Sequence, residues 1–233
     1  MGKAQARVAR QPTRPVAQRE SLARERYHHG SLHQALIDAT EDILAEHGIE
    51  GFTLREAARR AGVSAAAPAH HFGSAVGLLT EVALLGFEEL TRALKAASAG
   101  GGNDPATRLR EQGVAYVRFA LDHPGLFQLM FRQTKLKAKD ARLHEAGRAA
   151  MAELKTAIGD LFAQNKRRPS ERATLATTLA AWSAAHGFAQ LALEGKFDTE
   201  AGAMDARAFI EDLAPDVFAV LWPSAPRQKR SAA

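Results

Sequence analysis

Apolar residues recur every three or four positions along most of the chain between residues 31 and 222, which is the spacing of one face of an α-helix. Alanine is abundant among them. No run of alternating β-branched residues is long enough to indicate a strand, and no internal repeat is visible. The pattern therefore predicts an all-α protein.

Capping residues and helix breakers give the expected helix boundaries. The N-caps expected for the first four helices are Ser31, Thr53, Ser64 and Ser74. The first helix should end at Gly48, and the short third helix should run from about Ala65 to His71. Further helices are predicted over residues 105–121, 125–133, 140–164, 171–193 and 203–222. A glycine-rich loop at 99–105 and Pro223 delimit this second group.

Residues 53–73 have the pattern of a helix, a four-residue turn and a second helix. Thr53 and Glu56 have the spacing of a capping box at the start of the first of these helices. The small side chains of Ala57, Ala58 and Ala61 allow two helices to approach closely, and Gly62 permits a left-handed turn. The segment is typical of a helix-turn-helix that presents its second helix to the DNA major groove. An ordinary corner within a helical bundle is the alternative.

The surrounding motifs resemble those of TetR-type transcriptional regulators. The matching elements are Ala35-Leu36-Ile37-Asp38-Ala39, Glu46-His47-Gly48, Phe52-Thr53-Leu54-Arg55-Glu56, Ala61-Gly62-Val63-Ser64, His71-Phe72-Gly73-Ser74 and Leu78-Leu79. His123-Pro124-Gly125-Leu126-Phe127-Gln128-Leu129-Met130-Phe131, and Trp182 with His186-Gly187, resemble the effector domain of the WHG-type branch. The resemblance implies an N-terminal three-helix helix-turn-helix domain and a C-terminal helical bundle for effector binding and dimerisation.

The resemblance also implies which residues meet DNA. They are Thr53, Arg55, Ser64, Ala65, Ala66, Ala67, His70 and His71. Thr53 and Arg55 would meet a phosphate, and the alanines would face the groove. Two positions depart from the family pattern, because Ala69 stands where a tyrosine is usual and Ala75 where a lysine is usual. Both departures remove a common phosphate contact.

The net charge of +5 and the isoelectric point of about 9.7 indicate a polyanionic partner such as double-stranded DNA, but the charge is unevenly spread. Residues 1–27 carry seven basic and two acidic residues, whereas residues 28–80 carry three basic and six acidic ones. We therefore hypothesise that the 1–27 arm supplies much of the attraction to DNA, as minor-groove arms do. The expected domains are a basic flexible arm (1–27), a DNA-binding domain (28–80), an effector and dimerisation domain (81–222) and a basic tail (223–233).

The C-terminal half contains aromatic residues and methionines on apolar helix faces, which suit either a packed core or a pocket for a small apolar effector. The candidate pocket residues are Phe119, Phe127, Met130, Phe131, Trp182 and His186. The resemblance implies that helices 171–193 and 203–222 pair with a second subunit, so that a homodimer places two reading helices about one DNA turn apart. Ligand binding would favour a spacing of the two heads that no longer fits DNA, as in a repressor.

Other functional classes lack the residues they need. The chain has 0 Cys, which excludes disulfide and thiol chemistry and suits a reducing bacterial cytoplasm. His29 and His33 are four apart, but we expect Gly30 and Ser31 to break the helix between them, so we expect no metal site and no cofactor. No stretch approaches the ~18 apolar residues of a membrane span, and no apolar segment of a secretory signal follows the first arginines.

Two alternatives to a specific regulator remain open. The alanine-rich reading helix favours a weakly specific DNA-binding protein that acts through its basic arms. A helical-bundle enzyme is the other, although Asp140, His144 and Glu145 form only a weak candidate site and no nucleophile–base set is visible, so we expect no enzyme. Lys135, Lys137 and Lys139 are interpreted as a solvated loop.

Overall fold

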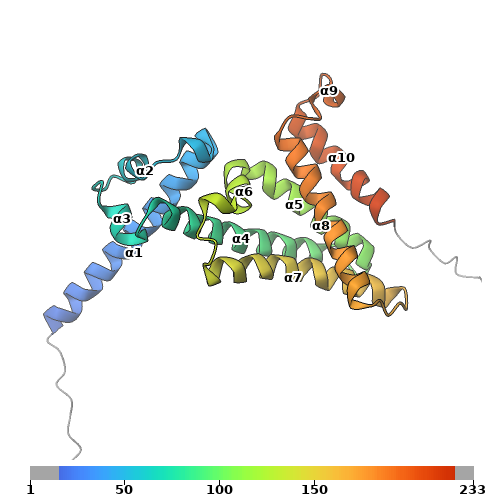
Figure 1. The fold of residues 1–233 in the computed structure, drawn as a ribbon, viewed down its shortest axis with the longest axis horizontal. Helices are drawn as coiled ribbons and strands as arrows, with labels where there is room; N and C mark the ends of the chain where they lie inside the picture. Colours follow the sequence, from blue (N-terminus) through green and yellow to red (C-terminus); the bar gives the residue numbers. More distant parts are fainter. Residues whose placement is uncertain (1–15, 224–233) are drawn as a thin grey trace, which may run out of the picture.

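The computed structural model describes residues 16–223, and within this range the chain forms ten α-helices and no strand (Figure 1). This confirms the all-α prediction. The helices are α1 (Val16–His47), α2 (Leu54–Arg60), α3 (Ala67–Phe72), α4 (Ala75–Gly100), α5 (Pro105–Asp122), α6 (Pro124–Met130), α7 (Ala141–Gln164), α8 (Glu171–Leu193), α9 (Asp198–Ala201) and α10 (Ala206–Leu221). Two 3₁₀ turns, η1 (Ile49–Gly51) and η2 (Gln133–Lys135), complete the order.

Helix α1 differs most from the prediction. It begins at Val16, so Ser31 lies inside the helix and is not its N-cap. Gly30 costs only about 1 kcal/mol relative to alanine within a helix, and the Arg-, Glu- and Ala-rich sequence before it has high helix propensity. Residues 16–27 of the expected flexible arm are therefore the first turns of α1. Residues 1–15 of that arm, and all of the basic tail except Pro223, lie outside the described residues.

Most other boundaries follow the local capping signals. The hydroxyl of Ser74 accepts a hydrogen bond from the backbone N–H of Gly77 (3.1 Å), and Asp104 and Ser170 cap α5 and α8 in the same way. The predicted helix 125–133 ends early, at Met130, and η2 follows it. The predicted helix 203–222 begins only at Ala206, after an additional short helix, α9, that the sequence pattern did not indicate.

The helices form two parts that share α4. In Figure 1, α1, α2 and α3 lie at one end of the molecule, α4 and α7 run side by side along its length, and α8 and α10 lie at the other end. The expected division at residue 80 falls inside α4. One core spans both parts, from Leu36 and Ile43 in α1 to Phe127 in α6 and Phe218 in α10. Any movement of the C-terminal helices against α1, α2 and α3 therefore has to repack this common core.

Helix α6 connects the two parts at close range. A side chain at Gly125 would collide with the backbone carbonyl of Leu44 in α1, so the two helices approach there as nearly as backbones allow. Another side of α6 faces Gly86 in α4. A Cβ added at Gly86 would lie only 2.8 Å from the Sδ of Met130 and 2.9 Å from the Cδ1 of Leu126. Glycine at these two positions is what lets α6 lie against both α1 and α4.

We predict that Gly125→Ala destabilises the protein by about 1–3 kcal/mol, because the added methyl group must push two helices apart. The matched control is Gly159→Ala, since a Cβ at this helical glycine in α7 meets nothing within 4 Å. The control should be neutral or stabilising, because alanine has the higher helix propensity. Chemical denaturation of both variants measures the difference. Equal stabilities would show that the α1–α6 contact is not tight.

Candidate nucleic-acid interface and effector pocket

The start of the helix-turn-helix forms only half of the predicted capping box. The Oγ1 of Thr53 accepts a hydrogen bond from the backbone N–H of Glu56 (3.1 Å), which confirms Thr53 as the N-cap of α2. The carboxylate of Glu56 does not return to Thr53. It accepts hydrogen bonds from Arg59 (2.6 and 2.8 Å) and from Arg60 (3.0 Å) instead.

The turn has the predicted geometry, but the second helix starts later than expected. Gly62 has a φ of 68°, and the backbone N–H of Val63 donates to the carbonyl of Ala58 (3.0 Å). Helix α3 begins at Ala67 with Ala66 as N-cap, so the expected Ser64 cap and the start at Ala65 are wrong. Pro68 sits in the first turn, where its missing N–H costs nothing, and this fixes the start of the helix.

The small residues of α2 do pack as predicted. Ala57 and Ala58 are fully buried, and α2 lies against both α1 and α3. Phe72, at the end of α3, is buried and its ring lies 4.5 Å from that of His33 in α1. These contacts hold α3 on the domain and leave its other side to solvent.

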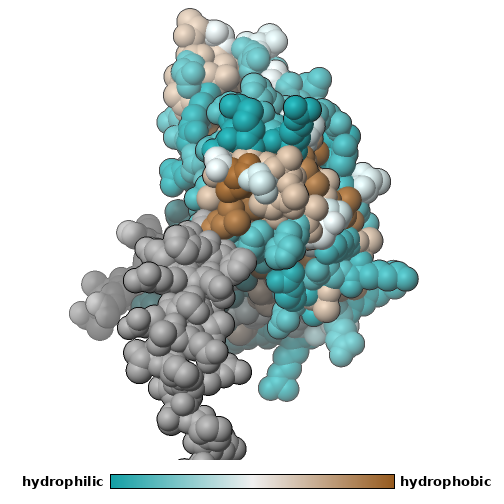
Figure 2. Space-filling view, turned by 90° about the vertical axis from the view of Figure 1, so that its left-hand side faces the viewer, coloured by the Kyte–Doolittle hydropathy of each residue, from teal (hydrophilic) through white to brown (hydrophobic). Residues whose placement is uncertain are grey.

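The residues expected to meet DNA form an exposed end of the molecule. Thr53 and Arg55 are exposed at the N-terminus of α2, and Ser64, Ala65 and Ala66 are exposed in the turn. Ala67 and His71 are partly exposed, and His70 is exposed. The face drawn in Figure 2, at this end, carries an apolar area bordered by hydrophilic surface. The exposed apolar side chains here include Ala65, Ala66, Ala69 and Val76.

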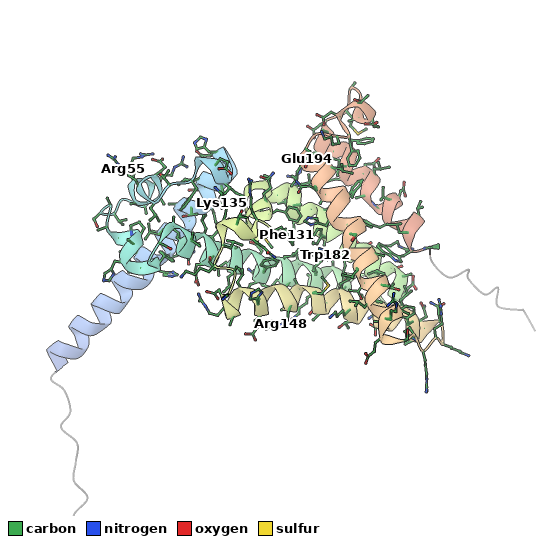
Figure 3. The ribbon with its side chains drawn as sticks, in the orientation of Figure 1. Arg55, Phe131, Lys135, Arg148, Trp182 and Glu194 are labelled. Carbon is green, nitrogen blue, oxygen red and sulfur yellow. The ribbon has the colours of Figure 1, made fainter. Side chains whose placement is uncertain are left out.

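Ion pairs occupy two of the three arginines between residues 32 and 80. Arg60 donates to Glu46 (2.8 and 2.9 Å) and to Glu56, while Arg59 binds Glu56 alone. The hydrogen bonds from Arg59 and Arg60 lower the pKa of Glu56 to about 2, and those from Arg60 also lower the pKa of Glu46. Both carboxylates therefore stay charged at neutral pH. Within these residues, Arg55 is the one arginine or lysine without a carboxylate partner (Figure 3).

A cavity of about 470 Å³ lies in the C-terminal part between α4, α5, α7 and α8, with the end of α6 at its side. Three of the predicted pocket residues, Met130, Phe131 and Trp182, line it. In Figure 3, Phe131 and Trp182 lie in the middle of the molecule among these helices. The cavity residues that the prediction lacked include Phe87, Gln112, Tyr116, Leu143, Met151 and Trp222.

The other three predicted pocket residues do not line the cavity. Phe127 is fully buried in the core and Phe119 is buried beside His123. His186 stands behind the cavity wall, where its Nδ1 lies 2.8 Å from the hydroxyl of Tyr116. The indole Nε1 of Trp182 donates to the same hydroxyl over 3.4 Å.

Hydrogen bonds join Tyr116 to both His186 and Trp182. Burial lowers the pKa of His186 and raises the pKa of Tyr116, so both side chains are neutral at pH 7. Because Trp182 can only donate, the Tyr116 hydroxyl accepts from it. The same hydroxyl donates to Nδ1 of a His186 ring that is protonated on Nε2, or accepts from Nδ1 in the other tautomer.

Residues considered for other chemistry have structural roles. Asp140 is the N-cap of α7, where it accepts hydrogen bonds from the backbone N–H groups of Arg142 (3.0 Å) and Leu143 (3.3 Å). The Nε2 of His144 bonds the carbonyl of Ala138 (2.7 Å). Lys135 is not simply solvated, because it forms an ion pair with Glu50 of η1 (3.2 Å).

Neither a membrane-spanning helix nor a cluster of metal ligands occurs among the described residues. Between residues 16 and 223, no helix is both long and apolar enough to cross a membrane. Among the side chains described there, no three His, Cys, Asp or Glu residues gather as metal ligands would. The helix break expected at Gly30 and Ser31 is absent, so it gives no argument against a metal site at His29 and His33.

Two family models match separate parts of the chain. Residues 36–82 match the family of bacterial regulatory proteins, tetR family, and residues 109–216 match the tetracyclin repressor-like C-terminal domain. No curated protein matches the sequence.

Solved structures share the fold over most of their length. A protein of unknown function from Rhodococcus sp. RHA1 is 33% identical, with a TM-score of 0.68 over 82% of this chain and 95% of its own. The TetR family transcriptional regulator PfmR from Thermus thermophilus is 22% identical, with a TM-score of 0.60 over 82% of this chain and 99% of its own. A TetR family transcription regulator from Marinobacter aquaeolei VT8 is 20% identical, with a TM-score of 0.58 over 82% and 97%. With its helix-turn-helix joined to a helical bundle, and with both halves matched, this chain belongs to the TetR family of bacterial regulatory proteins.

Proposed function

We propose that the protein is a dimeric, sequence-specific DNA-binding repressor of transcription in the bacterial cytoplasm, released from DNA by a small apolar ligand. The observation that carries this proposal is the pairing of an exposed helix-turn-helix with a largely apolar cavity across one shared helix, α4. The expected DNA contacts are the eight residues from Thr53 to His71 described above. No metal or cofactor has a part in this function.

Contact with DNA phosphates depends on few cations. The exposed N-terminus of α2 offers backbone N–H groups next to Arg55, and this combination suits a phosphate. Arg59 and Arg60 are engaged by carboxylates and add little. The groove-facing alanines can touch thymine methyl groups but donate no hydrogen bonds.

A binding assay tests the DNA-binding proposal and its most exposed cation. The protein should form a discrete complex with the DNA upstream of its own gene that survives genomic competitor DNA and protects one near-palindromic site. Arg55→Ala should weaken this complex and lower the slope of log affinity against log salt by about one. Arg59→Ala is the matched control and should change the slope little, because Glu56 already neutralises Arg59.

A second candidate, a weakly specific DNA-binding protein, is favoured by the exposed alanines at Ala65, Ala66 and Ala69. Diffuse protection that competitor DNA abolishes would establish it and overturn the sequence-specific repressor. An equal loss in Arg55→Ala and Arg59→Ala would instead overturn the assigned phosphate contact.

The arm of residues 1–27 is the expected source of the missing positive charge. Helix α1 carries Arg19, Arg24 and Arg26 in its first turns and extends beyond the other helices of the N-terminal end (Figure 1). Deletion of residues 2–26 should therefore weaken DNA binding and flatten its salt dependence by several units, as each lost phosphate contact removes about one. An unchanged slope would show that the arm does not contact DNA.

Dimerisation is supported by apolar side chains that α8 and α10 leave exposed. Leu175 and Leu179 of α8 are 51% and 45% exposed, and Val220 of α10 is 82% exposed. Both helices lie at the end opposite α1 to α3, as a two-fold partner would require for two outward-facing DNA-binding ends (Figure 1).

We predict that Leu179→Glu shifts the protein from dimer to monomer, because an unpaired carboxylate would have to be buried at the contact. Sedimentation equilibrium measures the mass of each form. Val76→Glu is the control, since Val76 is also exposed, at 38%, but lies beside the DNA-binding end. A wild-type protein that sediments as a monomer, or a dimer that tolerates Leu179→Glu, would contradict this interface.

The proposed release depends on α6. Met130, at the end of this helix, and Phe131, which follows it, line the cavity, while Gly125 at its start contacts α1. A ligand that displaces Met130 and Phe131 would press α6 against α1 and tilt the DNA-binding end. Release then requires that the ligand bind the tilted state more tightly than the DNA-competent one.

A further inference from the structure

One acceptor atom in the cavity wall has no hydrogen-bond partner. Gln112 of α5 is 3% exposed and lines the cavity. Its Nε2 donates to the backbone carbonyl of Glu153 in α7 over 3.4 Å, whereas its Oε1 is buried without a partner. Among the described residues, Arg108 Nε is the other buried side-chain nitrogen or oxygen in this condition, and Arg108 is not part of the cavity wall.

The orientation of the Gln112 amide is fixed by its neighbour. Exchanging the amide nitrogen and oxygen would place Oε1 against the carbonyl oxygen of Glu153, where two acceptors would face each other. The nitrogen therefore points to Glu153, and the free group is an acceptor. A buried acceptor without a donor is costly and rare in folded proteins. Because Gln112 belongs to the cavity wall, a bound ligand that reaches Oε1 would supply the missing donor.

Other polar groups of the cavity wall limit the chemistry of the ligand further. The Tyr116 hydroxyl already has two hydrogen-bond partners in the wall, His186 and Trp182, whereas Oε1 of Gln112 has none. The wall contains no aspartate or glutamate, and its one arginine, Arg148, is exposed, as is His144. The interior therefore offers neither a carboxylate for an ammonium group nor a buried cation for a carboxylate.

We propose that the effector is a mainly apolar, uncharged molecule with one hydroxyl or N–H group that donates a hydrogen bond to Oε1 of Gln112. This inference rests on the proposed function, because it takes the cavity to be the effector site. The cavity volume of about 470 Å³ suits a small molecule whose apolar part packs against residues such as Phe87, Phe131 and Trp182. Gln112 thus selects for a donor, and the rest of the wall selects for apolar shape.

Three probes of equal heavy-atom count separate the contributions of hydrogen-bond donation and of charge to ligand binding. Undecanol donates a hydrogen bond, decyl methyl ether only accepts one, and decanoate is anionic. The chain has 2 Trp, and both Trp182 and Trp222 line the cavity, so quenching of intrinsic fluorescence reports binding without any DNA. Undecanol should bind wild-type protein roughly three- to tenfold more tightly than the ether, which is the usual effect of one hydrogen bond. Decanoate should bind no more tightly than undecanol.

The variant Gln112→Met removes the acceptor at similar volume. It should bind undecanol and the ether equally, keep the wild-type affinity for the ether, and show a higher melting temperature because the unpaired acceptor is gone. Thr178→Val is the matched control, since Thr178 is also buried, donates to the Thr174 carbonyl (2.8 Å) and does not line the cavity. The control should keep the preference for undecanol.

Three outcomes would overturn the inference. Equal binding of undecanol and ether to the wild type would show that Oε1 does not select the ligand, and tighter binding of decanoate would show that Arg148 does. Quenching by none of the probes would remove both the cavity as effector site and this inference. DNA binding by the same preparation would then show whether the regulator itself still stands.

Discussion

The packing of α6 against α1 is the contact on which the relation between the two halves of the protein depends. Gly125 brings α6 onto the carbonyl of Leu44, while Gly86 brings α4 onto Leu126 and Met130 of the same helix. Phe127, between these contacts, is 0% exposed. Of this helix, only the end at Met130 and the adjoining Phe131 border empty space, in the cavity. In the proposed release, a ligand that takes up this space would move α6 against α1, since packed interfaces of this kind change between discrete arrangements rather than deform gradually.

The positive charge that the DNA-binding end offers depends on the partners of two carboxylates, Glu56 and Glu46. Glu56 forms hydrogen bonds with Arg59 and Arg60 instead of completing the cap of α2, and Glu46 holds Arg60 from α1. Exposed ion pairs contribute little stability, so their main consequence is electrostatic. They neutralise two of the three arginines between residues 32 and 80 and leave Arg55 and the α2 amides as the proposed phosphate contacts. The proposed DNA binding would then need further positive charge, and the arginines of residues 1–27 are the nearest source in the sequence.

Local signals allowed much of the fold to be predicted, and long-range packing explains most of what the sequence did not show. Thr53, Gly62 and Ser74 act through neighbouring backbone groups, so their roles could be inferred from spacing alone. The start of α1 could not, because the propensity of a long polar helix outweighs one glycine. Three of the six residues predicted for a pocket line the cavity. Trp182 and Phe131 lie on apolar stripes, but Met151 comes from a third helix, and His186 faces Tyr116 rather than the cavity. Gln112 did leave a signal, as a polar residue three positions after Leu109 and four before Tyr116 on an apolar helix face.

The cavity and the unpaired amide oxygen both lower the stability of the free protein. A void of this kind forfeits dispersion contacts, and a buried acceptor without a donor costs about 1–3 kcal/mol. A ligand that fills the void and supplies the donor removes both costs at once, and it stabilises the state to which it binds according to its concentration relative to its dissociation constant. Gln112 lies in α5, which packs against α4, α7, α8 and α10, so this gain is distributed over the bundle that carries the proposed dimer contact. The incomplete packing of the free protein is thus the physical basis of the ligand sensitivity that we propose.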